Sequence, residues 1–320
     1  MVDLSIIIVN WNAKEYLLGC VESICGTGAK GWEIIVADNG SIDGSGREAK
    51  ETFPFIQVIQ NRENLGFAKG VNQGLQKASG RYVLLLNPDT RVKNGAIQQL
   101  LSFMDRCSDA GIAGAQLLNP DGSKQNSIAR FPSLATELLN KSLLRRLFPK
   151  TFPGKERNYS EPIEVDSVIG ACMMVRRRAL DQVGILDEDY FLFLEETDLC
   201  YRMKRAGWKI YHVPQAQVDH FQGKSAEEVK KKARVEFYRS RYHFFKKNRG
   251  TWQWFVLLIG LLIKLMAEFV LTGIGNLFTF FALQKWKGRF SVYAYLLWWH
   301  LKFCPEEMGL KEATHIEGQR

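Results

Sequence analysis

Polar side chains follow three short apolar runs in the first third of this 320-residue chain. The runs are LSIIIVN (4–10), EIIVA (33–37) and YVLLL (82–86), and the polar residues at their ends are Asn10 and Asn12, Asp38 and Asn39, and Asn87 and Asp89. Side chains of these types can bind a polar ligand. The Asn87-Pro88-Asp89 sequence also has an ordinary reading, because these residue types favour turns. The arrangement of the three runs must decide between a turn and a site.

A second group of acidic residues lies further along the chain. Glu195, Glu196 and Asp198 fall within four residues after the apolar run YFLFL. Acidic residues are also stabilised in the first turn of a helix by its dipole, so this cluster has a structural alternative. Glu195 and Asp198 share one helix face, whereas Glu196 points elsewhere. His220 stands alone, and a single histidine is more often structural than a ligand.

The pattern of the chain predicts the elements that hold these residues. Apolar runs predict strands at 4–10, 33–37, 56–60 and 81–86, and helical spacing predicts helices at about 12–25, 66–78 and 94–106, with Asn12 as a cap. YFLFL reads as a short strand before a helix that starts near Glu195, and 119–164 reads as a long connection. Strands of this kind, alternating with helices, are typical of an α/β fold with a parallel sheet covered on both faces.

In such a sheet, ligands bind outside the carboxyl ends of the strands, so the three polar ends are expected to converge. The phosphate-binding patterns G-x-G-x-x-G and G-x-x-x-x-G-K-[ST] are absent after the first strand. Dinucleotide oxidoreductases and P-loop nucleotidases are therefore disfavoured.

Taken in order, the motifs resemble glycosyltransferase family 2, and within it a bacterial rhamnosyltransferase-like branch. The resemblance covers about residues 3–225 and rests on SIIIVNWN, VADNGSIDGS, NLGFAKGVNQG, LLLNPDT, GSKQNSIARFPS, VIGACMMVRR, FLEETDLCYRMKRAGW and HFQGKS. It implies a GT-A fold, which is Rossmann-like, with a mostly parallel sheet and helices on both faces.

The resemblance also implies roles for individual residues. Those at the donor nucleotide are Asn10, Asn12, Asp38, Asn39, Asn64, Gly66 and Asn87, and those of the acceptor and active-site loops are Arg130, Gly170, Ala171 and Glu195. Asp38 would accept a hydrogen bond from N3–H of uracil or thymine, a proton that cytosine lacks. Asp89, with His220 as a second ligand, would hold Mg²⁺ or Mn²⁺, which stabilises the leaving diphosphate. The nitrogen ligand would favour Mn²⁺.

The catalytic base implied by the resemblance is Glu196, with Asp198 as the alternative. The base takes a proton from the acceptor hydroxyl, and direct displacement inverts the anomeric centre. This sequence departs from the family pattern twice: Asn87 replaces the first Asp of the D-x-D element, and Glu196 replaces the usual Asp. Glutamate has the same chemistry on a longer side chain, and Asp89 still supplies a carboxylate.

The C-terminal part has a different character. Residues 226–320 hold 16 Lys and Arg against 8 Asp and Glu, while the rest of the chain is nearly neutral. We therefore divide the chain into a catalytic domain at 1–225 and a basic, aromatic-rich helical region at 226–320. Such a basic region indicates an anionic partner. The six cysteines form no C-x-x-C pair, which is typical of reduced thiols in the cytosol.

The apolar stretch 252–283 is long enough to cross a bilayer. It carries polar or small residues every three or four positions, namely Gly260, Lys264, Glu268, Thr272, Asn276 and Thr279, which a lone spanning helix should not place in hydrocarbon. We expect in-plane or re-entrant helices on the cytoplasmic leaflet, bound to an anionic membrane surface and not to nucleic acid. The alternatives are a single span, a soluble helical subdomain and an oligomer interface.

Together these features predict an inverting, metal-dependent glycosyltransferase at the cytoplasmic face of the bacterial inner membrane. By resemblance, it would move rhamnose from the nucleotide-diphosphate donor dTDP-rhamnose to a polyprenyl-linked glycan acceptor at the cell surface. One alternative is a UDP-hexose donor, such as UDP-glucose, UDP-galactose or UDP-galactofuranose. The other is a catalytically weak, nucleotide-sugar-binding scaffold subunit of a glycan assembly complex.

Overall fold

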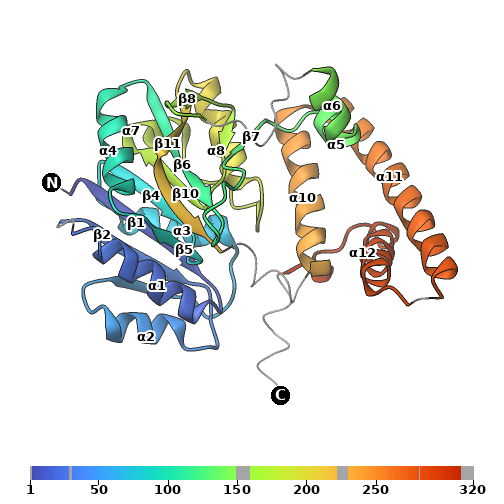
Figure 1. The fold of residues 1–320 in the computed structure, drawn as a ribbon, viewed down its shortest axis with the longest axis horizontal. Coiled ribbons are helices and arrows are strands. Elements are labelled where there is room, and N and C mark those ends of the chain that lie inside the picture. Colours follow the sequence, from blue (N-terminus) through green and yellow to red (C-terminus); the bar gives the residue numbers. More distant parts are fainter. Residues whose placement is uncertain (1, 29–30, 149–158, 222–229, 281, 311–320) are drawn as a thin grey trace. The chain divides into compact units, whose positions relative to one another are not determined.

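The computed structural model describes residues 2–28, 31–148, 159–221, 230–280 and 282–310 (Figure 1). The chain forms two compact units, one made of 1–131 and 154–225 and the other of 132–153 and 226–320. The sequence suggests one boundary at residue 225. The structure adds the segment 132–153, which leaves the first unit and returns to it, to the C-terminal unit.

A mixed nine-stranded sheet forms the centre of the first unit, in the order β3-β2-β1-β4-β10-β6-β11-β5, with β8 beside β11. Four strands run parallel, as predicted: β1 (Leu4–Asn10), β2 (Glu33–Asp38), β3 (Gln57–Gln60) and β4 (Tyr82–Leu86). β10 (Cys172–Arg176) is antiparallel to both β4 and β6 (Ala110–Leu118). β11 (Lys209–His220) is parallel to β6 and antiparallel to β5 (Thr90–Val92) and β8 (Ile163–Glu164).

Helices cover both faces of the sheet, as Figure 1 shows. They are α1 (Lys14–Cys25), α2 (Ser45–Thr52), α3 (Phe67–Lys77), α4 (Ala96–Arg106), α7 (Arg177–Val183) and α8 (Glu195–Arg205). Alternate strand residues face opposite sides. In β1, Ile6 and Ile8 pack with residues of α1 and α4, whereas Ile7 packs with residues of α3 and α8. The fold is therefore the α/β arrangement that the sequence predicts.

Two local predictions were wrong. Asn12 does not cap α1, because the N-cap is Ala13 and the Asn12 Oδ1 instead accepts the Ile42 N–H at 2.8 Å. The run YFLFL forms no strand: Phe193 and Leu194 have positive φ angles of 73° and 66°, and α8 begins at the next residue. The left-handed backbone turns the chain sharply at this point, which apolar composition alone did not reveal.

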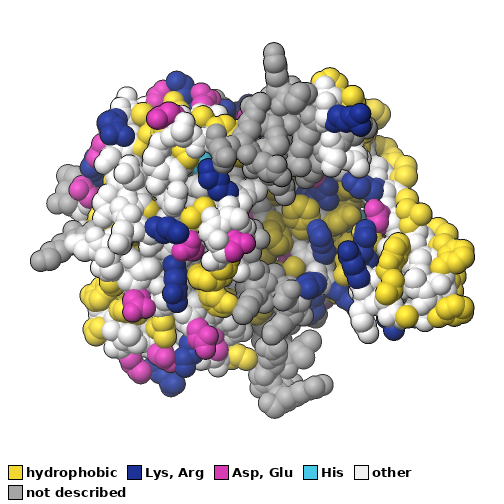
Figure 2. Space-filling model, viewed as in Figure 1, with side chains coloured by type: hydrophobic (Ala, Val, Ile, Leu, Met, Phe, Trp, Pro, Cys, Tyr) yellow, Lys and Arg dark blue, Asp and Glu magenta, His cyan; other side chains and the backbone are white. Residues whose placement is uncertain are grey.

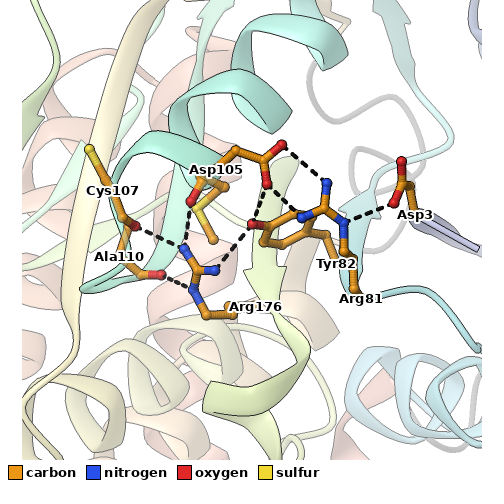
Figure 3. Close-up of polar contacts among 8 residues, drawn as sticks. Asp3, Arg81, Tyr82, Asp105, Cys107, Ala110 and Arg176 are labelled. Carbon is orange, nitrogen blue, oxygen red and sulfur yellow. Dashed lines mark hydrogen bonds and ion pairs between the residues drawn. The ribbon is translucent and has the colours of Figure 1, made fainter. Parts of the chain in front are cut away.

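A polar network holds the amino end of β4, the edge of the sheet away from the polar strand ends (Figure 3). The Arg176 guanidinium donates to the carbonyls of Met104, Cys107 and Ala110 at 2.6–2.8 Å, and to the Tyr82 hydroxyl at 3.1 Å. Asp105 accepts from Tyr82 and from Arg81. The network ties together strands of both orientations, so its role is structural.

The second unit contains α5 (Leu134–Leu138), α6 (Lys141–Leu147), α10 (Lys230–Asn248), α11 (Thr251–Phe278) and α12 (Gln284–Leu301). A buried core joins α10, α11 and α12 through Val235, Leu265, Leu296 and Trp299. Of the helices that the structure describes, α11 alone is long and apolar enough to cross a membrane.

The polar stripe of α11 faces other helices of the same unit. Gly260 lies against Leu138 of α5, Gly275 lies against Trp286 of α12, and Thr272 and Asn276 are buried. Glu268 pairs with Arg289 of α12 at 3.2 Å. The opposite side exposes apolar side chains, which gather along α11 in Figure 2: Phe255, Ile259, Ile263, Met266, Val270, Ile274 and Leu277. Most of the stripe is thus an internal packing surface, while Lys264 is exposed.

Candidate active site

The polar residues after β1 and β2 form one hydrogen-bonded group. Asn10 and Asp38 are direct partners in the β1–β2 register, and the Asn10 Nδ2 donates to the Asp38 Oδ1 at 2.9 Å. The hydroxyl of Ser41 also donates to Oδ1, and the Gln60 Nε2 donates to Oδ2 at 2.6 Å. Asp38 is 1% exposed. Since each carboxylate oxygen has two lone pairs, Oδ2 retains acceptor capacity for a ligand.

The residues next to this group hold loops in place. Asn39 donates to the Gly66 carbonyl at 2.9 Å, and the Asn64 Oδ1 accepts the Gly66 N–H at 2.9 Å. Gly66 has a φ of 87°, and a Cβ there would stand 2.6 Å from the Phe191 carbonyl oxygen, so only glycine fits. The Asn12 N–H donates to the Ser41 Oγ at 2.9 Å. These predicted nucleotide residues therefore shape the rim around Asp38.

The turn after β4 meets the end of β11. Residue His220 pairs with Thr90 in the β11–β5 register, which places the His220 Nε2 3.4 Å from the Asp89 Oδ1. The other ring nitrogen, Nδ1, lies 3.0 Å from the Gln125 Oε1. The rest of the predicted HFQGKS motif, residues 222–225, lies outside the described residues.

Asp89 and His220 suit a divalent cation. The Asp89 and His220 side chains are 20% and 10% exposed, so they are largely buried but still reach solvent. A carboxylate oxygen and an imidazole nitrogen are a ligand pair that Mn²⁺ accepts, and Mg²⁺ requires mostly oxygen ligands. The pair lies at the carboxyl ends of the parallel strands, where a ligand of this fold binds. The residues therefore fit such an ion.

The start of β10 connects this turn to α8. Because Cys172 pairs with Leu86, the preceding Ala171 carbonyl accepts the Asn87 N–H at 3.0 Å. The next residue back, Gly170, lies against Glu196, since a Cβ on Gly170 would be 3.4 Å from the Glu196 Cβ and Cγ. The structure thus brings together Asn87 and Glu196, which are separated by more than a hundred residues, through a two-residue segment.

The three acidic residues of α8 have different surroundings. Glu196 is half-buried, whereas Glu195 and Asp198 are buried. This agrees with the prediction that Glu195 and Asp198 share one face of the helix and Glu196 points elsewhere. Burial raises the pKa of Glu196. Burial, and then the charge of Glu196, raises the pKa of Glu195 well above its usual range. The Glu195 Oε2 has no hydrogen-bond partner among the described residues.

Asp198 is occupied by a structural contact. It is fully buried, and the Arg202 Nε donates to its Oδ2 at 2.8 Å. The same guanidinium donates to the carbonyls of Val183, Gly184 and Ile185, which fixes the loop that leads to α8. This leaves Glu196 as the accessible carboxylate of α8. Arg130 is exposed after β7 (Ile128–Ala129) and lies 3.3 Å from Asp166, in the acceptor-side segment.

Two glutamines in this site were not predicted from the sequence. Gln60 ends β3 and orients Asp38, and Gln125 contacts His220 across 95 residues of sequence. Gln60 ends a predicted strand beside Asp38, so its position was available in principle. Nothing in the pattern around Gln125 identifies its partner.

Comparison with known proteins places the chain among sugar-transferring enzymes. The model of the family described as Glycosyl transferase family 2 matches residues 5–184. The chain is 28% identical over 264 residues to the N-acetylglucosaminyl-diphospho-decaprenol L-rhamnosyltransferase of Mycobacterium tuberculosis, covering 78% of this chain and 86% of the relative. It is 27% identical to the rhamnosyltransferase WbbL of Escherichia coli K12, covering 68% and 82%.

Two solved structures are similar in fold. The mannosyltransferase PcManGT from Pyrobaculum calidifontis, in complex with GDP-Man and Mn²⁺, gives a TM-score of 0.54 at 14% identity, with 93% of this chain and 86% of that chain covered. GalNAc-T7 with UDP, GalNAc and Mn²⁺ gives 0.52 at 17% identity, with 69% and 44% covered. At these identities the likeness shows the fold alone, which is GT-A as predicted.

Proposed function

Because the chain belongs to glycosyl transferase family 2, we propose that this glycosyltransferase moves a rhamnosyl group from dTDP-rhamnose to a glycan carried on polyprenyl diphosphate. Two relatives are named as rhamnosyltransferases, and the name of one specifies a decaprenol-linked acceptor. Both names concern those proteins, and this chain shares most of its length with each of them. The donor nucleotide and the acceptor are our proposal.

The observation that carries the proposal is the short structural path from Asp89 to Glu196. Asp89 and Asn87 lie in one turn, the Asn87 N–H binds the Ala171 carbonyl, and Gly170 lies against Glu196. A group that holds the diphosphate and a group that takes a proton must face the same anomeric carbon from opposite sides. A path made mostly of backbone holds the two groups at a constant separation.

The residues then act as follows. Asp38 accepts N3–H of the thymine ring through the remaining acceptor capacity of Oδ2, while Asn10, Ser41 and Gln60 hold its carboxylate still. Asp89 and His220 would hold a divalent cation, and such an ion would supply positive charge against the diphosphate leaving group. Glu196 takes up the proton of the acceptor hydroxyl as the oxygen attacks the anomeric carbon. Attack from the side opposite the diphosphate inverts that centre.

The raised pKa of Glu196 suits a base, because a less acidic carboxyl group binds a proton more strongly. Glu195 beside it is uncharged over a wider pH range and needs no counter-ion. Asp198 is then a positioning residue, since its contact with Arg202 fixes the start of α8. No second carboxylate is required as an acid, in contrast to glycoside hydrolases.

We further propose that the C-terminal unit binds the cytoplasmic face of the membrane through α11. The exposed apolar side of this helix runs along its full 28 residues, or about 42 Å, while its polar side is covered by α5 and α12. A one-sided apolar surface suits a helix that lies in the plane of the headgroups. The six cysteines are free thiols, which is consistent with the cytoplasm.

A panel of donors tests the proposal. The purified protein would be incubated with Mn²⁺, a polyprenyl-diphosphate-linked acceptor, and dTDP-rhamnose, UDP-glucose, UDP-galactose or UDP-galactofuranose in turn. Release of dTDP with formation of a glycosylated lipid is expected only from dTDP-rhamnose. Transfer from a UDP-hexose instead would replace the proposed donor while retaining the enzyme class.

A further inference from the structure

We propose that Gln125 is a positioning residue that fixes the tautomer of His220, so that an unprotonated Nε2 faces Asp89 and is ready to bind a divalent cation. The inference rests on the proposed metal role of His220 and Asp89. It is independent of which sugar is transferred.

Two hydrogen bonds fix the orientation of the Gln125 amide. Its Nε2 donates to the His220 carbonyl oxygen at 2.5 Å, and its Oε1 lies 3.0 Å from the His220 Nδ1. A carbonyl oxygen only accepts hydrogen bonds, so the nitrogen of the amide must face it. The amide oxygen is then the atom that faces Nδ1, and it can only accept. The hydrogen of the ring must therefore lie on Nδ1.

A hydrogen on Nδ1 determines the state of the other ring nitrogen of His220, Nε2. A neutral imidazole with its hydrogen on Nδ1 has a lone pair on Nε2. This lone pair faces the Asp89 Oδ1, 3.4 Å away. Two acceptors at that separation repel each other unless a cation or a proton lies between them. The arrangement is that of a metal ligand oriented by an outer partner, which typically also raises the ligand's affinity for the ion.

Gln125 is itself rigidly held. It is 7% exposed, its N–H donates to the Leu117 carbonyl of β6 at 2.8 Å, and its carbonyl accepts from the Gln116 Nε2 at 3.0 Å. Two residues further on, the Ser127 carbonyl accepts the Ile169 N–H at 3.0 Å, immediately before Gly170. The long connection after β6 therefore fixes both the ring of His220 and the segment that lies against Glu196.

The competing arrangement is a neutral His220 that carries its hydrogen on Nε2, facing Asp89. It would leave the Nδ1 lone pair facing the Gln125 Oε1 at 3.0 Å, as two acceptors. The position of the single ring hydrogen separates the two arrangements, so the experiment must observe both ring nitrogens directly.

The side-chain ¹⁵N resonances of the full-length protein report this state. The chain has five histidines, so the His220 signals would be assigned by their loss in His220→Asn. Without metal, and at a pH high enough for the ring to be neutral, the wild type is expected to carry its single ring hydrogen on Nδ1 and none on Nε2. The Gln125→Met variant, which keeps the length of the side chain but neither hydrogen bond, should show a mixture of tautomers.

Metal affinity gives a second readout, measured by titration with Mn²⁺ and electron paramagnetic resonance. The Gln125→Met variant should bind Mn²⁺ about 10–100-fold more weakly. Gln125→Glu keeps an acceptor for Nδ1–H and should retain the tautomer of the wild type. Asn126→Ala is the matched control, because this neighbouring exposed amide donates to the Ile128 carbonyl and not to His220, and its loss should change neither readout.

A neutral His220 ring in the wild type that carries its hydrogen on Nε2 would overturn the proposal without any substitution. So would a folded Gln125→Met variant with unchanged Mn²⁺ affinity. A failure of the wild type to use dTDP-rhamnose would contradict the proposed function but leave both of these readouts intact, so the two failures are distinguishable.

Discussion

The Glu196 side chain lies against Gly170, at a distance where a Cβ on Gly170 would stand 3.4 Å from the Glu196 Cβ and Cγ. The adjoining Ala171 accepts the N–H of Asn87, so the proposed base and the proposed metal-binding turn are joined by backbone. Catalysis by displacement depends on the alignment of such groups, and backbone contacts preserve alignment better than long side chains do.

The buried carboxyl of Glu195 predicts a specific dependence of stability on pH. Its pKa is raised in the folded state, so its contribution to the free energy of unfolding is fully present below the unfolded pKa of about 4.3 and is lost as the pH rises through the folded pKa. The Glu195→Gln variant should therefore lose less stability than the wild type between pH 5 and pH 8. Urea unfolding at several pH values measures the free energy of unfolding of both proteins. If this free energy changes with pH equally in the wild type and in Glu195→Gln, Glu195 ionises normally.

Asp38 predicts a preference among nucleotides. Calorimetry should show that dTDP and UDP bind more tightly than CDP to the wild type, because cytosine lacks the N3–H that Asp38 accepts. In Asp38→Asn the amide can donate to N3 of cytosine, so this preference should fall by about tenfold, the equivalent of one hydrogen bond. Glu51→Gln, on the exposed side of the nearby α2, is the control for loss of charge. Equal binding of all three nucleotides to the wild type would exclude direct reading by Asp38.

The network around Arg176 predicts a loss of stability without a change in chemistry. Arg176→Ala removes the donor from three carbonyls and from the Tyr82 hydroxyl, which should lower the free energy of unfolding by about 2–3 kcal/mol. Arg178→Ala, at an exposed position two residues later, should cost under about 0.5 kcal/mol. Transfer per folded molecule should be equal in both variants, and a selective loss in Arg176→Ala would link this network to the active site.

Binding of vesicles tests the exposed side of α11. Ile263 and Leu271 are 65% and 60% exposed, and substituting both by Glu should reduce co-flotation with phosphatidylglycerol vesicles at least tenfold, since each buried aliphatic side chain contributes about 1.5–3 kcal/mol. Phe55→Glu changes a residue of the first unit with 64% exposure and should have no effect. Unchanged flotation in the double variant would favour a protein partner, such as a second copy, for this side.

Regular elements were the most predictable part of the fold. The first four strands, with α1 and α3 between them, follow from apolar runs and helical spacing, and the parallel order of the strands brings Asn10 beside Asp38. The short helix α2 was not predicted. The insertion of β10 antiparallel between β4 and β6 did not follow, because strand order depends on contacts distant in sequence. That insertion places Gly170 and Ala171 in the site.

The site was predictable as a set of residues but not as a set of partners. Asp89 and His220 come together because β11 pairs with β5, a pairing that the sequence does not state. The polar stripe of α11 was visible in the sequence, yet its partners on α5 and α12, such as Leu138 beside Gly260 and Arg289 beside Glu268, could not be identified from a sequence pattern. Likewise, the two carboxylates Asp198 and Glu196 are told apart by their surroundings. Asp198 is buried against Arg202, whereas Glu196 is accessible.

The proposed role of Glu196 as the base is tested by comparing the wild type with an isosteric variant. Transfer from dTDP-rhamnose to a polyprenyl-diphosphate-linked acceptor would be measured for the wild type and Glu196→Gln, together with the dissociation constant for dTDP. We expect turnover to fall about 10²–10⁴-fold while dTDP binding is unchanged, because the amide keeps the shape of the side chain but cannot take the proton. A Glu196→Gln variant that transfers rhamnose at the rate of the wild type would contradict this role.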